Sequence, residues 1–135
     1  MPGRAAPKRR ALDSQAEALL AAHTALEKQA EAVVVMDVRG LSSVTDFFVV
    51  CTASSTRQLA ALKDAIEAIL AQQGCAVWHT EGTASAPASS GPFTHEPQWV
   101  LMDCGDIVVH LLDQHARAFY RLEDLWADAP RVPIA

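Results

Sequence analysis

Acidic and histidine side chains lie close to a glycine bend in a strongly hydrophobic part of this sequence. Asp103 and Asp106 flank Cys104-Gly105, and His110 follows four residues after Asp106. The flanking runs are rich in Val, Ile and Leu, so they predict two paired strands, with the glycine at the bend because it tolerates positive φ. An apolar core normally excludes carboxylates. The two aspartates therefore either lie at a solvated turn or belong to a site that needs negative charge.

The histidines and cysteines carry no pattern typical of a metal site. Asp106 and His110 could face the same side of a strand and share a hydrogen bond, which fits a structural histidine better than a catalytic base. The five histidines show neither HxxxH nor HxH spacing, and no Cys-x-x-Cys is present. No Gly-x-Ser-x-Gly elbow, P-loop or dinucleotide fingerprint occurs either. We therefore expect no metal, no cofactor and no catalytic nucleophile.

A second group of chemistry-bearing residues is Gly40-Leu41-Ser42-Ser43, followed by Asp46 before an apolar strand. Nucleotidyltransferases hold phosphate on such Gly-Ser backbone N–H groups and magnesium on two strand carboxylates. Those carboxylates must stand at i and i+2, because alternate residues of a strand share a face. Here Phe48 occupies the i+2 position. Phosphoryl transfer is thus the alternative function, and Asp46 is better explained as a turn or cap residue.

Trp99 opens the first strand of the predicted hairpin. A large amphipathic ring at this place either packs into the core or stays partly exposed and anchors a partner. Asp103 and Asp106 lie on the same hairpin, so an aromatic contact ringed by acids would complement a basic, partly apolar protein surface.

Charge is distributed unevenly along the 135 residues. The net charge is −5, but four basic residues fall in the first ten positions, which leaves 7 basic and 16 acidic side chains, a net −9, in the rest. An acidic body is repelled by nucleic-acid phosphates and attracted to basic proteins. We expect direct RNA contact at most from the basic N-terminal tail, for which a solvated end is the simpler explanation.

Hydrophobic patterning and cysteine content predict a cytoplasmic location. No apolar run approaches the roughly 20 residues that span a bilayer, and no apolar signal core follows the basic N-terminus. Three cysteines, far apart in sequence and beside or within apolar segments, are best explained as reduced thiols.

Periodicity and turn residues predict one α/β domain, a mixed β-sheet flanked by helices. Ser14–Glu17 fits a capping box that starts a helix running to about Glu31. Ser54, Ser55 or Thr56 caps a second helix, which ends at Gly74. The remaining expected elements are strands at 32–38, 47–52 and 75–80, the hairpin at 99–112, and a short helix at 116–126. Outside them we expect a basic flexible tail at 1–12, a mobile loop at 83–97 within the domain 13–128, and a C-terminal tail at 129–135.

Several motifs in succession make the sequence closely similar to the ribosomal silencing factor family, also called the Iojap family. They are Asp37–Thr52 (DVRGLSSVTDFFVVCT), Ser55–Gln58 (STRQ), Glu81-Gly82, Trp99–His110 (WVLMDCGDIVVH) and Phe119–Trp126 (FYRLEDLW). The resemblance extends over roughly residues 20–130, and the ordered set is far more specific than any single motif.

The resemblance implies a nucleotidyltransferase-like fold without nucleotidyl transfer. Family members bind the fourteenth protein of the large ribosomal subunit and sterically block joining of the small subunit, which represses translation under nutrient limitation; free members can form homodimers. The partner-binding residues implied for this chain are Trp99, Asp103, Asp106 and His110, with Glu81 and Gly82 nearby. The matched positions Ser42, Thr45 and Asp46 are expected to be structural. The chain departs from the family in a longer connection over 83–98 and in Cys104, where a bulkier residue is common.

Overall fold

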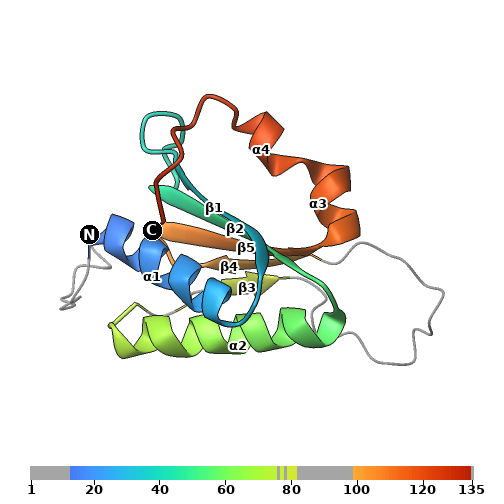
Figure 1. The fold of residues 1–135 in the computed structure, drawn as a ribbon. Helices are drawn as coiled ribbons and strands as arrows, with labels where there is room; N and C mark the ends of the chain where they lie inside the picture. Colours follow the sequence, from blue (N-terminus) through green and yellow to red (C-terminus); the bar gives the residue numbers. More distant parts are fainter. Residues whose placement is uncertain (1–12, 76, 78, 82–98, 135) are drawn as a thin grey trace.

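The computed structural model describes residues 13–75, 77, 79–81 and 99–134, and its centre is a mixed five-stranded sheet (Figure 1). The order across the sheet is β1-β2-β5-β4-β3. Strands β2 and β5 run parallel, whereas the other neighbouring pairs are antiparallel. The strand bounds are β1 Glu31–Asp37, β2 Phe47–Ala53, β3 His79–Glu81, β4 Trp99–Asp103 and β5 Ile107–Asp113. The predicted α/β class with a mixed sheet is confirmed.

Two long helices, α1 (Ser14–Glu27) and α2 (Thr56–Gln72), cover one face of the sheet, called here the α1/α2 face (Figure 1). Ser55 is the N-cap of helix α2, and its Oγ accepts a hydrogen bond from the Gln58 N–H at 3.0 Å. Its apolar stripe recurs every three or four residues and is fully buried: Leu59, Leu62, Ile66 and Leu70. Burying each such side chain stabilises the fold by about 1.5–3 kcal/mol.

The first helix begins one residue earlier than the capping-box pattern predicts. Asp13 is its N-cap and accepts from the Ala16 N–H at 2.8 Å. Ser14 instead donates its Oγ–H to Asp46 Oδ2 at 2.9 Å, which ties the start of α1 to the loop before β2. The prediction of Ser14 as the cap is therefore wrong, because an aspartate one position upstream offers an equally good acceptor.

Helix α1 also ends before the predicted Glu31, and β3 begins after the predicted Cys75. Gln29 adopts a left-handed conformation at φ 71°, which stops α1 at Glu27. At the end of α2, Gly74 has φ 82° and the Cys75 N–H still bonds to Leu70 O at 2.9 Å. The chain around Cys75 is thus held against the helix end, and the strand starts only at His79.

Two short helices, α3 (Gln114–Tyr120) and α4 (Leu122–Leu125), lie on the opposite face, called here the α3/α4 face. A single helix was expected over 116–126, but Arg121 adopts φ 49° and divides it. Arg117 fixes the arrangement by donating to the Glu123 carboxylate, to Thr52 Oγ1 and to Ala32 O. This partly buried guanidinium therefore joins α3 to Glu123 of α4 and to strands β2 and β1.

The segment 129–134 is not the tail that its prolines suggest. Asp37 N–H donates to Pro130 O at 2.8 Å, and Val132 N–H donates to Val35 O at 2.8 Å. Arg131 forms a bridge with Met36, and the Val132 side chain packs on the core. The segment thus lies along β1 and covers that edge of the sheet. The expected tail at 1–12 and loop at 83–97 lie outside the described residues.

Candidate partner-binding site

The predicted hairpin forms as expected from its glycine and its flanking apolar runs. Strands β4 and β5 pair with Leu101 opposite His110 and Asp103 opposite Val108. At the bend Gly105 has φ 87°, and its N–H donates to Asp103 Oδ1 at 2.9 Å. Asp103 thus shapes the turn with one carboxylate oxygen while its side chain stays half-buried at the end of the sheet.

Trp99 and His110 share the α3/α4 face and contact each other across the two strands. The Trp99 Nε1–H donates to His110 Nδ1 at 3.1 Å, and the ring centroids lie 5.7 Å apart. The indole is half-buried, whereas the imidazole is 5% exposed. The predicted pairing of His110 with Asp106 is wrong, because Trp99 occupies Nδ1 and Nε2 has no hydrogen-bond partner among the described residues.

Burial sets the protonation of His110. Loss of solvent lowers the pKa of its imidazole to about 4, so the ring is neutral at physiological pH. Since Nδ1 accepts the indole N–H, the proton of the neutral ring sits on Nε2. The site therefore holds a buried N–H donor that no described residue accepts, a group that native structures usually satisfy with water or a ligand.

Two aromatic residues that the sequence reasoning did not select complete this cluster. The Phe48 ring packs edge-to-face on His110 at 5.0 Å between centroids and on Trp126 at 5.1 Å. Trp99, Phe48 and Trp126 are all half-buried and rest on the apolar residues of the α3/α4 face. Phe48 was detectable as the i+2 neighbour of Asp46. Trp126 lies 78 residues further along the sequence, so no local pattern predicts the contact between the two rings. We call Trp99, His110, Phe48 and Trp126 the aromatic cluster.

The second set of predicted residues gathers at the bend end of the hairpin. The main-chain oxygen of Asp106 accepts from the N–H groups of Asp46 at 2.9 Å and Phe47 at 3.3 Å. Asp46 accepts from Ser14, as described, and Ser42 Oγ accepts from the Val44 N–H at 3.1 Å. These bonds hold the loop before β2 beside the hairpin bend.

Thr45 lies in the same loop and is 6% exposed. Its Oγ1 has no hydrogen-bond partner among the described residues. Of the remaining predicted residues, Glu81 pairs through its backbone with Leu101, and Gly82 lies outside the described range. The structure therefore divides the predicted site into an aromatic part, with Trp99 and His110, and a bend part, with Asp103 and Asp106.

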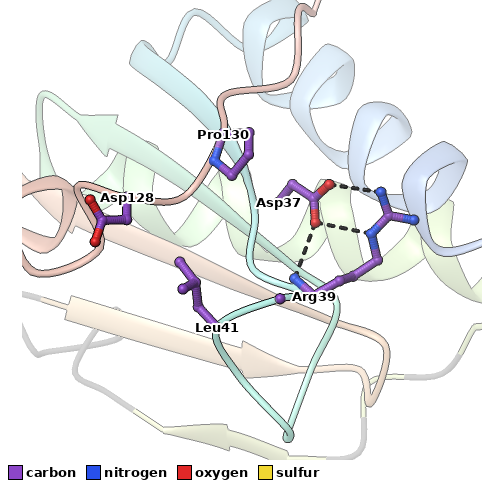
Figure 2. Close-up of a pocket in the computed structure, with 6 residues that line it drawn as sticks. Asp37, Arg39, Leu41, Asp128 and Pro130 are labelled. Carbon is purple, nitrogen blue, oxygen red and sulfur yellow. Dashed lines mark hydrogen bonds and ion pairs between the residues drawn. The ribbon is translucent and has the colours of Figure 1, made fainter.

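A shallow pocket of about 400 Å³ opens between the β1–β2 loop and the C-terminal segment (Figure 2). It is lined by Asp37, Arg39, Gly40, Leu41, Asp128 and Pro130. Arg39 donates two side-chain hydrogen bonds to Asp37, at 2.9 and 2.7 Å, and this bonding lowers the pKa of the Asp37 carboxyl. The Arg39 guanidinium is thus already paired with the Asp37 carboxylate, whereas a phosphate-binding guanidinium would present its N–H groups to the ligand. Within the described ranges no three His, Cys, Asp or Glu side chains are grouped as metal ligands.

Comparison with known proteins gives a consistent result. The family model described as "Ribosomal silencing factor during starvation" matches residues 11–135. The chain belongs to the ribosomal silencing factor family. Ribosomal silencing factor RsfS of Halalkalibacterium halodurans is 36% identical over 115 residues, which cover 85% of this chain and 89% of that protein. The chloroplastic protein Iojap of Zea mays is 33% identical over 113 residues, or 84% of this chain and 44% of that protein.

Two solved structures share the fold of this chain. A crystal structure of a Chromobacterium violaceum protein superposes with a TM-score of 0.73 at 28% identity, covering 86% of this chain and 88% of the other. A Bacillus halodurans structure gives 0.68 at 34% identity, covering 88% and 98%. The family places the protein in ribosome-related translation regulation, and its name denotes a regulator rather than an enzyme. No described helix is both long and apolar enough to cross a membrane.

Proposed function

We propose that this protein binds the large ribosomal subunit through ribosomal protein 14 and sterically prevents the small subunit from joining. Translation is thereby repressed when nutrients are limiting. Membership in the ribosomal silencing factor family supports the ribosomal target. The mechanism is occupancy of a surface in the cytoplasm, where subunits join, and it requires no bond to be made or broken.

The single observation that best supports this proposal is the half-buried Trp99 on a hairpin whose bend carries the half-buried Asp103 and Asp106 at its other end. Its indole is held by His110 at 3.1 Å, so the ring is already ordered before a partner arrives. Pre-ordering an aromatic anchor reduces the entropy lost on binding. An anchor of this kind in a water-excluding surround is typical of interface hot spots.

Electrostatics favour a basic protein as the partner. Asp103 and Asp106 lie half-buried at the bend, where the Asp103 carboxylate is fixed by the Gly105 N–H. Outside the first ten residues the chain carries a net −9, which repels bare RNA and attracts basic surfaces. A ribosomal protein that presents apolar and basic side chains matches both parts of the site.

Co-sedimentation of purified protein with large subunits tests the contact surface. We expect Trp99→Ala and Asp106→Arg each to reduce binding by at least tenfold, because one removes the anchor and the other reverses a charge at the bend. Asp64→Arg is the matched control: Asp64 is an α2 carboxylate whose side chain is 78% exposed on the far side of the sheet, and its reversal should leave binding unchanged. Binding by both site variants at the wild-type level would contradict this surface.

Subunit joining tests the mechanism separately from binding. Light scattering should show slower formation of the joined ribosome as the protein saturates large subunits, and Trp99→Ala should restore the normal rate. Binding without any effect on joining would refute steric occupancy while leaving the partner intact. Labelled nucleoside triphosphates with magnesium should give no product; turnover would instead support the phosphoryl-transfer alternative.

The free protein is also proposed to form homodimers through the surface that receives the ribosomal protein. The half-buried Trp99, Phe48 and Trp126 offer apolar area that a second copy can cover. Trp99→Ala should then shift the protein toward monomer in sedimentation equilibrium. If Trp99→Ala left the dimer unchanged, the dimer would form through a different surface.

A further inference from the structure

Two of the three cysteines contact each other although they are far apart in sequence. Cys75 follows the end of α2, and Cys104 lies at the bend between β4 and β5. The Cys75 Sγ lies 4.0 Å from Cys104 O, and the two thiols share a hydrogen bond. Both residues are 4% exposed. Cys51, in the centre of β2, is completely buried and provides an internal comparison.

The bend of the hairpin and the end of α2 are places where the backbone can open locally. Each cysteine adjoins a glycine in the left-handed region, Gly74 at φ 82° and Gly105 at φ 87°. Turns and helix ends open with lower free energy than strands in the centre of a sheet. An oxidant can therefore reach Cys75 and Cys104 without the global unfolding that exposure of Cys51 requires.

We propose that Cys75 and Cys104 are a modification site, at which a small-molecule disulfide such as oxidised glutathione converts the two thiols into an intramolecular disulfide. The bond would join the end of α2 covalently to the bend that carries Asp103 and Asp106. This inference is independent of the ribosomal function proposed above, because it concerns only the chemistry of the two thiols.

The reaction proceeds in two balanced exchange steps. Loss of the Cys75 proton gives a thiolate, which attacks one glutathione sulfur, forms a mixed disulfide and releases one glutathione thiolate. Cys104 then loses its proton and attacks the Cys75 sulfur, which forms the Cys75–Cys104 bond and releases the second glutathione. Two protein thiols are oxidised and one glutathione disulfide is reduced to two glutathiones.

The order of attack follows from the surroundings of Cys104. The hydrogen bond with Cys75, burial, and the nearby carboxylates of Asp103 and Glu17 raise the pKa of Cys104 far above its usual value. Cys104 therefore stays protonated at neutral pH, and we assign the first attack to Cys75. Since only the thiolate reacts, formation of the disulfide should be slow at neutral pH and accelerate by nearly tenfold for each added pH unit.

The test uses the full-length native protein with excess oxidised glutathione at pH 7 to 9, well below its melting temperature. Intact mass should fall by about 2 Da, with no retained glutathione, and peptide mapping should find Cys75 joined to Cys104. The pair is separated by 29 residues, so closing this loop should raise the melting midpoint by several degrees, and dithiothreitol should reverse the change.

Cys51→Ser provides the matched control. This variant should form the same disulfide at the wild-type rate, whereas Cys75→Ser and Cys104→Ser should at most retain one glutathione. Three outcomes would overturn the proposal: no loss of 2 Da in the native protein, stable mixed disulfides that never resolve, or disulfides to Cys51 formed as fast as the Cys75–Cys104 bond. The last result would mean that oxidation occurs only through unfolding. Wild-type mapping remains decisive if a serine variant fails to fold.

Discussion

The two faces of the sheet differ in what they bury. On the α1/α2 face, the strands and helices meet through aliphatic side chains that are almost all inaccessible to water. On the α3/α4 face, three aromatic rings remain half-buried around a histidine whose Nε2–H has no partner among the described residues. The first face is a packed, mostly aliphatic core, in which the Glu17 side chain of α1 is also fully buried. The second has apolar area and a hydrogen-bond donor still available, as a surface that recognises a partner requires.

This difference assigns stability mainly to the α1/α2 face and partner recognition to the α3/α4 face. An unmatched buried donor costs about 1–3 kcal/mol, which the folded state must offset elsewhere. The close packing of α1 and α2, through stripes of alanine on one helix and leucine and isoleucine on the other, provides that offset. Changes on the two faces should therefore have different effects, and the following predictions test this separation.

The largest effect is expected on the α1/α2 face. Leu62→Ala removes a fully buried side chain from the centre of α2 and leaves a cavity in the core. We expect the free energy of unfolding to fall by about 2–5 kcal/mol in urea titrations. Large-subunit binding, corrected for the folded fraction, should not change. A loss below 1 kcal/mol, or weaker binding by the folded variant, would contradict the separation.

The α3/α4 face should instead respond to pH through His110. Burial lowers its pKa from 6.5 to about 4. Between pH 6.5 and pH 4, His110 is therefore protonated in the unfolded chain but neutral in the folded chain. Stability should be unaffected above pH 6.5 and should fall as the pH drops toward 4, by about 3 kcal/mol in total. Urea titrations from pH 7.5 to 4 measure this dependence.

His110→Gln is the variant that isolates this contribution. Its amide oxygen keeps an acceptor for the Trp99 indole N–H but has no titration in this range. Below pH 6.5 the variant should lose less stability than the wild type, and the difference between the two curves should grow as the pH falls. If the free energy of unfolding of the wild type and of His110→Gln depended on pH in the same way, the His110 imidazole would be solvated in the native state.

The hairpin, the β1–β2 pair and helix α2 were predictable because their signals are local. Gly105 between two apolar runs specified the bend, and Ser55 with the apolar stripe of α2 specified that helix. By contrast, the break at Arg121 goes with tertiary contacts: Arg117 bonds to Thr52 Oγ1 and Ala32 O and so fastens α3 to strands β2 and β1. Intrinsic helix propensity alone gives no sign of this break.

The candidate site was predictable in part for the same reason. Trp99 and the two hairpin aspartates were chosen from one continuous motif. The contact of Phe48 with Trp126 joins a strand to the segment after α4, so no spacing rule relates the two rings. His110 was placed on the correct strand but given the wrong partner, because its bond to Trp99 depends on the register of β4 against β5.

The smallest effect concerns the start of α1, where the sequence pattern and the structure disagree on the cap. Asp13→Ala should cost about 1 kcal/mol, because the Ala16 N–H loses its acceptor. Ser14→Ala should cost a similar or smaller amount through the lost bond to Asp46. Neither change lies on the α3/α4 face, so binding to large subunits should persist.

A double-mutant cycle distinguishes the two explanations of Ser14. If its hydroxyl acts through Asp46, the costs of Ser14→Ala and Asp46→Ala should be non-additive by about 0.5–1.5 kcal/mol in urea titrations, since each change removes the same bond. If Ser14 were the cap, the cost of Ser14→Ala would be additive with the cost of Asp46→Ala. It would instead be non-additive with the cost of Glu17→Gln. If the costs of Ser14→Ala and Asp46→Ala are additive, the capping-box interpretation of Ser14 is correct. The Ser14–Asp46 hydrogen bond would then not stabilise the loop before β2 against α1.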